Sequence, residues 1–124
     1  FGPRRLLMAA MLLTALRWYL IGHYVDTLWI ILLAQLLHAA SFGLYHAVSI
    51  ELFHRLFIGK YQGRGQALYS SISFGAGGAI GSYVSGLLWD QFSPAVIFNL
   101  AALAALLAFV ISSRFIYLAE TRES

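Results

Sequence analysis

The chain has 124 residues, of which 60% are hydrophobic and 10% charged, and its mean hydropathy is +0.77. Soluble domains average about a quarter charged residues, so this composition excludes an ordinary soluble domain and is typical of an integral membrane protein. The formal net charge of +3 is too small to indicate a nucleic-acid partner, and without cysteine there is no thiol or disulfide chemistry.

Four apolar segments follow one another along the chain, each long enough to cross a hydrocarbon core of about 30 Å as a helix. The sequence therefore predicts an all-α fold embedded in the lipid bilayer. The expected helices cover residues 5–22, 27–50, 65–89 and 95–117, with a longer polar loop at 51–64.

The basic residues at the start of the first helix, in the longer loop, and at or after the end of the fourth helix would all lie on one side of the membrane if the chain crosses four times. The two short loops on the other side carry Asp26 and Asp90 and no Lys or Arg. An excess of Lys and Arg marks the cytoplasmic side, so we expect both ends of this segment in the cytoplasm and the protein in the inner (plasma) membrane. The residues behind this expectation are Arg4, Arg5, Arg55, Lys60, Arg64, Arg114 and Arg122.

The second segment carries polar and titratable side chains in a stretch that is otherwise apolar enough for lipid. On a helical wheel they share about a third of the circumference, and aliphatic residues occupy the other side. Unpaired polar groups in hydrocarbon cost several kcal/mol each, so this stripe is expected to face another helix or a wet cavity. Its members are Gln35, His38, Phe42, Tyr45, His46 and Ser49.

The first segment contains Arg17, about five residues before its non-cytoplasmic end. Two interpretations remain open for it. Its long side chain could reach the membrane surface, where Trp18 and Tyr19 suit an interfacial aromatic belt. Alternatively, Arg17 points inward and holds an anionic group, because a membrane-embedded arginine is a functional candidate by default.

The third segment has two notable faces. Gln66, Tyr69 and Ser73 lie on one face and could line the same cavity from the other side, although serine hydroxyls also bond back to their own helix. Small residues at three- and four-residue spacing predict close packing against neighbouring helices, as is usual in lipid. These small residues are Gly75, Gly77, Gly78, Gly81, Ser82 and Gly86.

No constellation for catalysis or metal binding is visible. His38 and His46 are separated by about 12 Å of helical rise, which is too far to share one metal ion. Neither an HExxH motif nor a pair of intramembrane carboxylates occurs. We therefore expect no cofactor, no metal and no enzyme activity.

Three stretches of the sequence resemble the last four helices of major facilitator superfamily transporters: LRWYLIG, LLHAASFGLYHAVSIEL and GRGQALYSSISFGAGGAIGSYVSGLLWD. The most similar branch contains the 3-phenylpropionate transporters and is related to the lactose permease and the nucleoside–proton symporters. The resemblance implies that the chain is a C-terminal fragment, helices nine to twelve of twelve, whose N-terminal helices are partners in the complete transporter.

The resemblance also implies roles for single residues. Arg17 and His38 match an arginine of helix nine and a histidine of helix ten in the proton-coupling network of the sugar symporters. Those permeases carry a glutamate three residues after the histidine, where this chain has Ser41. In the family, helices ten and eleven border the central cavity and helices nine and twelve are peripheral.

The expected function is therefore part of a secondary transporter that moves a small organic solute, such as an aromatic acid anion, together with protons by alternating access. The residues expected to line its path are Arg17, Gln35, His38, Tyr45, His46, Gln66, Tyr69 and Ser73. Two alternatives stay open: a small transporter that works as an oligomer of four-helix chains, and a membrane scaffold in which the polar stripe only joins helices.

Overall fold

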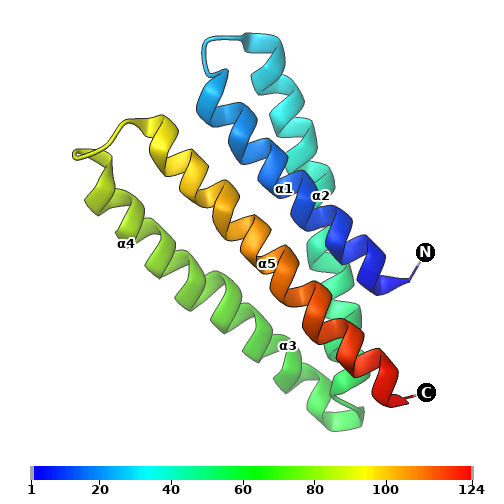
Figure 1. Cartoon of the computed structure of the whole chain (residues 1–124). Coiled ribbons are helices and arrows are strands. Elements are labelled where there is room, and N and C mark those ends of the chain that lie inside the picture. Colours follow the sequence, from blue (N-terminus) through cyan, green and yellow to red (C-terminus); the bar gives the residue numbers. More distant parts are fainter. Residues whose placement is uncertain (1, 124) are drawn as a thin grey trace.

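The computed structural model describes the backbone of residues 2–123 and the side chains of residues 2–116. This part of the chain is helical throughout, apart from short connections (Figure 1). The element order is α1 (Pro3–His23), α2 (Leu28–Leu56), η1 (Gly59–Tyr61), α3 (Gln62–Ser70), η2 (Ser71–Ala76), α4 (Gly77–Trp89) and α5 (Pro94–Glu123). The all-α membrane fold expected from the sequence is thus confirmed.

Three of these helices, among the residues the structure describes, are single elements long and apolar enough to cross a membrane: α1, α2 and Pro94–Ile116 of α5. Prolines open α1 and α5, at positions where their missing N–H costs no helical hydrogen bond. The third expected span is a helical run, Gln62–Trp89, built from α3, η2 and α4. At about 1.5 Å per residue this run also exceeds the thickness of the hydrocarbon core.

The polar connection between the second and third segments is shorter than the predicted loop at 51–64. Helix α2 continues to Leu56, and in its last turns Glu51 accepts a hydrogen bond from Arg55 Nε at 2.8 Å, an ion pair one turn apart on the helix surface. The chain then reverses through Gly59, whose φ of +62° favours glycine.

η2 interrupts the third span with one turn of π-helix, which periodicity does not predict. The turn lies beside a group of glycines that weaken the preference for regular α-helix. A Cβ on Gly77 would lie 3.4 Å from the carbonyl oxygen of Ile72, five residues earlier, which is an ordinary van der Waals contact. π-Helical turns are rare and often mark functional segments.

α1 lies between α2 and α5 and packs against both of them. Near its end, Trp18 stacks on Phe98 of α5 with ring centroids 5.6 Å apart, and His23 hydrogen-bonds with Asn99 at 2.9 Å. Gly22 lies so close to α5 that an added Cβ would meet the Cβ of Phe98 at 2.8 Å. α5 is therefore not only lipid-facing, since one of its sides is fixed to α1.

The small residues of η2 and α4 do not pack on other elements of the described chain. A Cβ built at Gly75, Gly78, Gly81 or Gly86 meets no other heavy atom within 4 Å, apart from immediate neighbours and the local helix backbone, and Ser82 is exposed. α4 itself touches α5 only sparingly. Close packing through this face therefore stays a prediction.

The two ends of the bundle differ in charge. Both termini and the connection after α2 lie at one end, and the two short turns lie at the other (Figure 1). The first end carries Arg4, Arg5, Arg55, Lys60, Arg64 and Arg114, while the side chain of Arg122 lies outside the described residues. Asp26 and Asp90 are at the opposite end. The positive and negative charges are thus separated between the two ends, as the predicted orientation requires. That the positive end faces the cytoplasm stays a prediction.

Replacing Gly22 by alanine should lower the melting temperature of the purified protein, because the new methyl group meets Phe98 and overpacking costs about 1–3 kcal/mol. Gly43→Ala in α2 is the matched control, since it meets nothing within 4 Å and should be neutral or stabilising. Thermal unfolding in detergent measures both. Equal stability of the two variants would contradict the close α1–α5 contact.

The orientation can be tested with single cysteines in a background that has no other cysteine. Ser93→Cys in the α4–α5 turn should react with a membrane-impermeant maleimide on intact cells. Tyr61→Cys should react only after permeabilisation, because the positive end is expected inside. The reverse labelling pattern would overturn the predicted topology.

Candidate functional site

Helix α2 uses two adjacent faces for different contacts. Ala34, Ser41 and Val48 recur at seven-residue spacing and are buried, with Ser41 only 1% exposed. Residues seven apart lie along one line of a helix, and this line faces α1. The next face carries the aromatic and histidine stripe that includes His38 and Tyr45, and it faces the side on which α3 and η2 lie.

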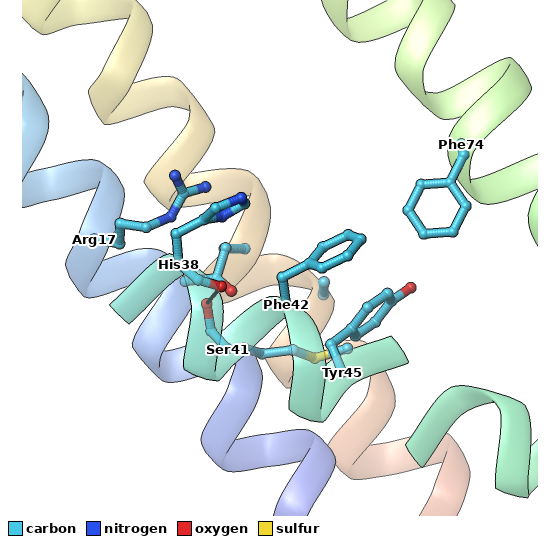
Figure 2. Close-up of a pocket in the computed structure, with 10 residues that line it drawn as sticks. Arg17, His38, Ser41, Phe42, Tyr45 and Phe74 are labelled. Atoms are coloured by element: carbon cyan, nitrogen blue, oxygen red, sulfur yellow. Dashed lines mark hydrogen bonds between the residues drawn. The ribbon is translucent and has the colours of Figure 1, made fainter. Parts of the chain in front are cut away.

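Arg17 is directed into the protein. It is 9% exposed, its guanidinium carbon lies 4.0 Å from the ring centroid of Trp18, and it lines a cavity with His38 (Figure 2). Its Nε is buried and has no hydrogen-bond partner among the described residues. This burial agrees with the inward direction of the second interpretation, because a snorkelling arginine would expose its head group. That Arg17 holds an anionic group stays a prediction.

The cavity beside Arg17 has a volume of about 280 Å³. Arg17 and His38 lie at one end of it, and Phe42 and Tyr45 extend from α2 toward Phe74 of η2 (Figure 2). Apart from the arginine, the lining is largely apolar and aromatic. A cation in such surroundings is poorly solvated, so an anion that entered the cavity would find a strong electrostatic partner.

A second cavity, of about 260 Å³, continues toward the positive end of the bundle. Met11 and Tyr45 line both cavities, so the two adjoin along α2. The second contains more hydroxyl groups, among them Ser49, Tyr69 and Ser73. Together the cavities form a cleft that leads from the buried arginine to the hydroxyl groups of α3 and η2.

Aromatic rings join α2 to the third span. The His46 ring is nearly parallel to Phe42, with centroids 5.9 Å apart, and its Nδ1 is 3.3 Å from the hydroxyl of Tyr69. Tyr69 is 4% exposed and contacts Phe53 and Phe74 as well. His46 therefore helps to fix the wall of the cleft, although it lines neither of these two cavities.

The π turn explains why Phe74 belongs to the site. On a regular α-helix, residues five apart point about 140° away from each other. Hydrogen bonds in a π-helix join residues five apart, which brings Phe74 round toward the side of Tyr69, and their ring centroids are 5.8 Å apart. The α-helical wheel therefore could not place Phe74 in the cleft.

The predicted path residues divide into two groups. Arg17, His38, Tyr45, Tyr69 and Ser73 line the two cavities, with His46 in contact with Tyr69. Gln35 and Gln66 are exposed and line neither cavity, so their part in the path stays a prediction.

Besides Phe74, three lining residues of α1 were not predicted from the sequence: Leu7, Met11 and Thr14. Thr14 Oγ1 donates to the carbonyl of Ala10 at 2.8 Å. A threonine whose hydroxyl bonds to its own helix does not by itself indicate a cavity. A helical wheel of the first segment would have placed Thr14 and Arg17 on one face, because they are three residues apart.

Comparison with known proteins agrees with this architecture. A family model described as the MFS_1 like family matches residues 1–100, which is most of the chain. Among curated proteins and solved structures, none matches. The relation to the major facilitator superfamily is thereby confirmed, while the branch and the position within twelve helices stay predictions. This multi-pass chain belongs to the MFS_1-like family and is of the major facilitator transporter type.

Proposed function

We propose that the cleft between α1, α2 and η2 is the part of a solute path that this chain contributes to a proton-coupled secondary transporter. The solute is a small organic anion whose body is apolar or aromatic. Neighbouring helices of the same transporter complete the path, because Phe42 and Phe74 line the cleft yet remain about half exposed.

The observation that carries the proposal is the buried position of Arg17 in an apolar cavity. A guanidinium group presents its N–H donors in a plane that matches a carboxylate. The rings of Phe42, Tyr45 and Phe74 provide stacking surface for an aromatic or aliphatic body next to that carboxylate. Charge and ring lining together favour an aromatic acid over a sugar, which would need many more polar partners.

His38 is the group in this cleft best suited to carry the proton. It lines the same cavity as Arg17, and the unperturbed pKa of histidine lies near physiological pH. Neither cavity is lined by a carboxylate, and the residue at the family's glutamate position, Ser41, donates its hydroxyl to the carbonyl of His38 at 3.4 Å. Among the residues whose side chains the structure describes, a carboxylate for coupling in this cleft is therefore not supplied by the cavity walls, and we infer that it comes from another helix of the transporter.

Alternating access requires two bundles that move about a site near the midplane of the membrane. α1–α5 would form part of one such bundle. The scaffold alternative gives the cleft no solute, whereas membership of a transporter family favours transport. The oligomeric alternative predicts the same cleft. It differs only in that further copies of this chain would form the opposite wall of the solute path.

Arg17→Gln should reduce uptake of a radiolabelled aromatic carboxylate, such as phenylpropionate, by about 10- to 100-fold in kcat/KM. The range corresponds to the loss of one charge-assisted hydrogen bond of about 1.5–3 kcal/mol. Proteoliposomes containing the full-length transporter provide the measurement.

Arg55→Gln is the matched control for Arg17→Gln, because Arg55 is exposed at the end of α2 and pairs with Glu51. It should leave uptake unchanged. If neither variant alters transport of any organic anion while both proteins fold, the scaffold alternative is the better account.

His38→Asn should separate solute movement from the proton gradient. In the wild type an acidic exterior should accelerate uptake, because a proton enters with the solute. The variant should keep exchange of solute across the membrane but lose this acceleration, since asparagine cannot carry a proton. His54→Asn, near the end of α2, is the control, and equal acceleration in the wild type and His38→Asn would exclude His38 as the proton carrier.

A further inference from the structure

Trp18, the residue that follows Arg17 in α1, contacts the arginine without lining the cleft. The guanidinium carbon of Arg17 lies 4.0 Å from the centroid of the Trp18 ring. Trp18 lines neither cavity of the cleft, but it does line a separate hollow of about 460 Å³ that α4 and α5 border. The indole is therefore part of the wall that separates the cleft from this hollow.

The indole ring is itself fixed by α5. It stacks on the ring of Phe98, with centroids 5.6 Å apart and an angle of 25° between the planes. Trp18 is half-buried, whereas Tyr19, the next residue, is 47% exposed and contacts the ring of His23. Of these two aromatic residues, Tyr19 has the position that suits an interfacial belt, and Trp18 lies between a cation and a second ring.

The contact between Trp18 and Arg17 stabilises a buried cation and leaves its hydrogen-bond donors free for a ligand. A guanidinium group over an aromatic ring is attracted to the face of the ring, and most strongly where water is excluded. Its N–H donors lie at the edge of the guanidinium plane, and the Nε of Arg17 has no hydrogen-bond partner among the described residues. A carboxylate side chain would also stabilise the arginine, but it would occupy the donors that an anionic solute needs.

The part of α5 that borders the same cavity consists of small apolar residues, Ala105 and Ala108. The acidic residues of α5, Glu120 and Glu123, are at least twelve positions beyond Ala108, which is about 18 Å farther along the helix toward the positive end of the bundle. Arg17 and Trp18 therefore meet at a level of the bundle that is remote from the acidic end of α5.

We propose that Trp18 is a positioning residue for solute binding, which holds the guanidinium of Arg17 in the cleft before the anion arrives. A long arginine side chain five residues from a helix end could otherwise turn toward the membrane surface. Solute binding would then have to pay for bringing the group back, whereas a group already in place binds more tightly. This inference rests on the proposed function, in which Arg17 binds the carboxylate of the solute.

Trp18→Leu tests the proposal, because leucine keeps an apolar side chain and removes the aromatic face. Isothermal titration calorimetry of the full-length transporter in detergent should show binding of 3-phenylpropionate weakened about 2- to 30-fold, the range of one cation–π contact. In uptake assays KM should rise while kcat stays unchanged, as expected for the loss of uniform binding. Trp29→Leu in α2 is the matched control, since Trp29 is 78% exposed, and it should leave both unchanged.

Two further measurements separate positioning of Arg17 from a general structural role. The neutral 3-phenylpropionamide should bind equally to the wild type and to Trp18→Leu, because no carboxylate is involved. In an Arg17→Gln background, Trp18→Leu should have no additional effect on the affinity for phenylpropionate, since a residue that acts through Arg17 cannot act without it.

Trp18→Phe keeps the test valid if Trp18→Leu fails to fold, because phenylalanine can still stack on Phe98. Its affinity for phenylpropionate should lie between those of the wild type and Arg17→Gln, as tryptophan is the best partner for a cation.

The outcomes distinguish this inference from the proposed function. If Arg17→Gln weakens binding of phenylpropionate and neither Trp18 variant does, the positioning role alone is wrong. Equal weakening of the acid and the amide in Trp18→Leu, or additive effects of the Arg17 and Trp18 substitutions, would also overturn it. If Arg17→Gln leaves the affinity for phenylpropionate unchanged, the proposed function fails and the inference fails with it.

Discussion

A polar group inside a membrane has no water to satisfy it, so its position decides which sides of the helices face one another. The buried arginine of α1 shows the constraint most clearly, because its guanidinium lies within the protein and not in lipid. The histidine and tyrosine stripe of α2 gathers on the same cleft. Apolar side chains then occupy the remaining surfaces, where they are exposed to hydrocarbon at no cost.

The same constraint explains what the sequence could predict. Length, hydropathy and charge predicted the helices, because the backbone in lipid must satisfy its own hydrogen bonds. The wheel of the second segment placed His38 and Tyr45 on one face, and both line the cleft. The extent of α2 past Ile50 was less predictable, since the charged residues there are typical of a loop, whereas in the structure Glu51 and Arg55 form an ion pair on the helix surface.

Other parts of the site could not be predicted, since they depend on geometry that no periodic pattern contains. Phe74 reaches the cleft only because η2 widens the helix by one residue per turn, and the α-helical period assumes that no such turn exists. Asn99 is a polar group inside the last segment, and its partner, His23, is 76 positions away in the chain. Pairings of that kind depend on which helices become neighbours.

The contacts between α1 and α5 have a mechanical consequence. They occur at both ends of the pair: the Gly22–Phe98 approach and the His23–Asn99 hydrogen bond at one end, and the Arg4–Ser113 hydrogen bond at the other. Contacts at both ends of the α1–α5 pair oppose both sliding of one helix along the other and separation of the two helices. With α2 packed along α1, these three helices form a stiff frame, whereas α4 has little attachment to it. α4, which follows the π turn and its adjoining glycines, is thereby the part of the chain least held by contacts with the other described helices.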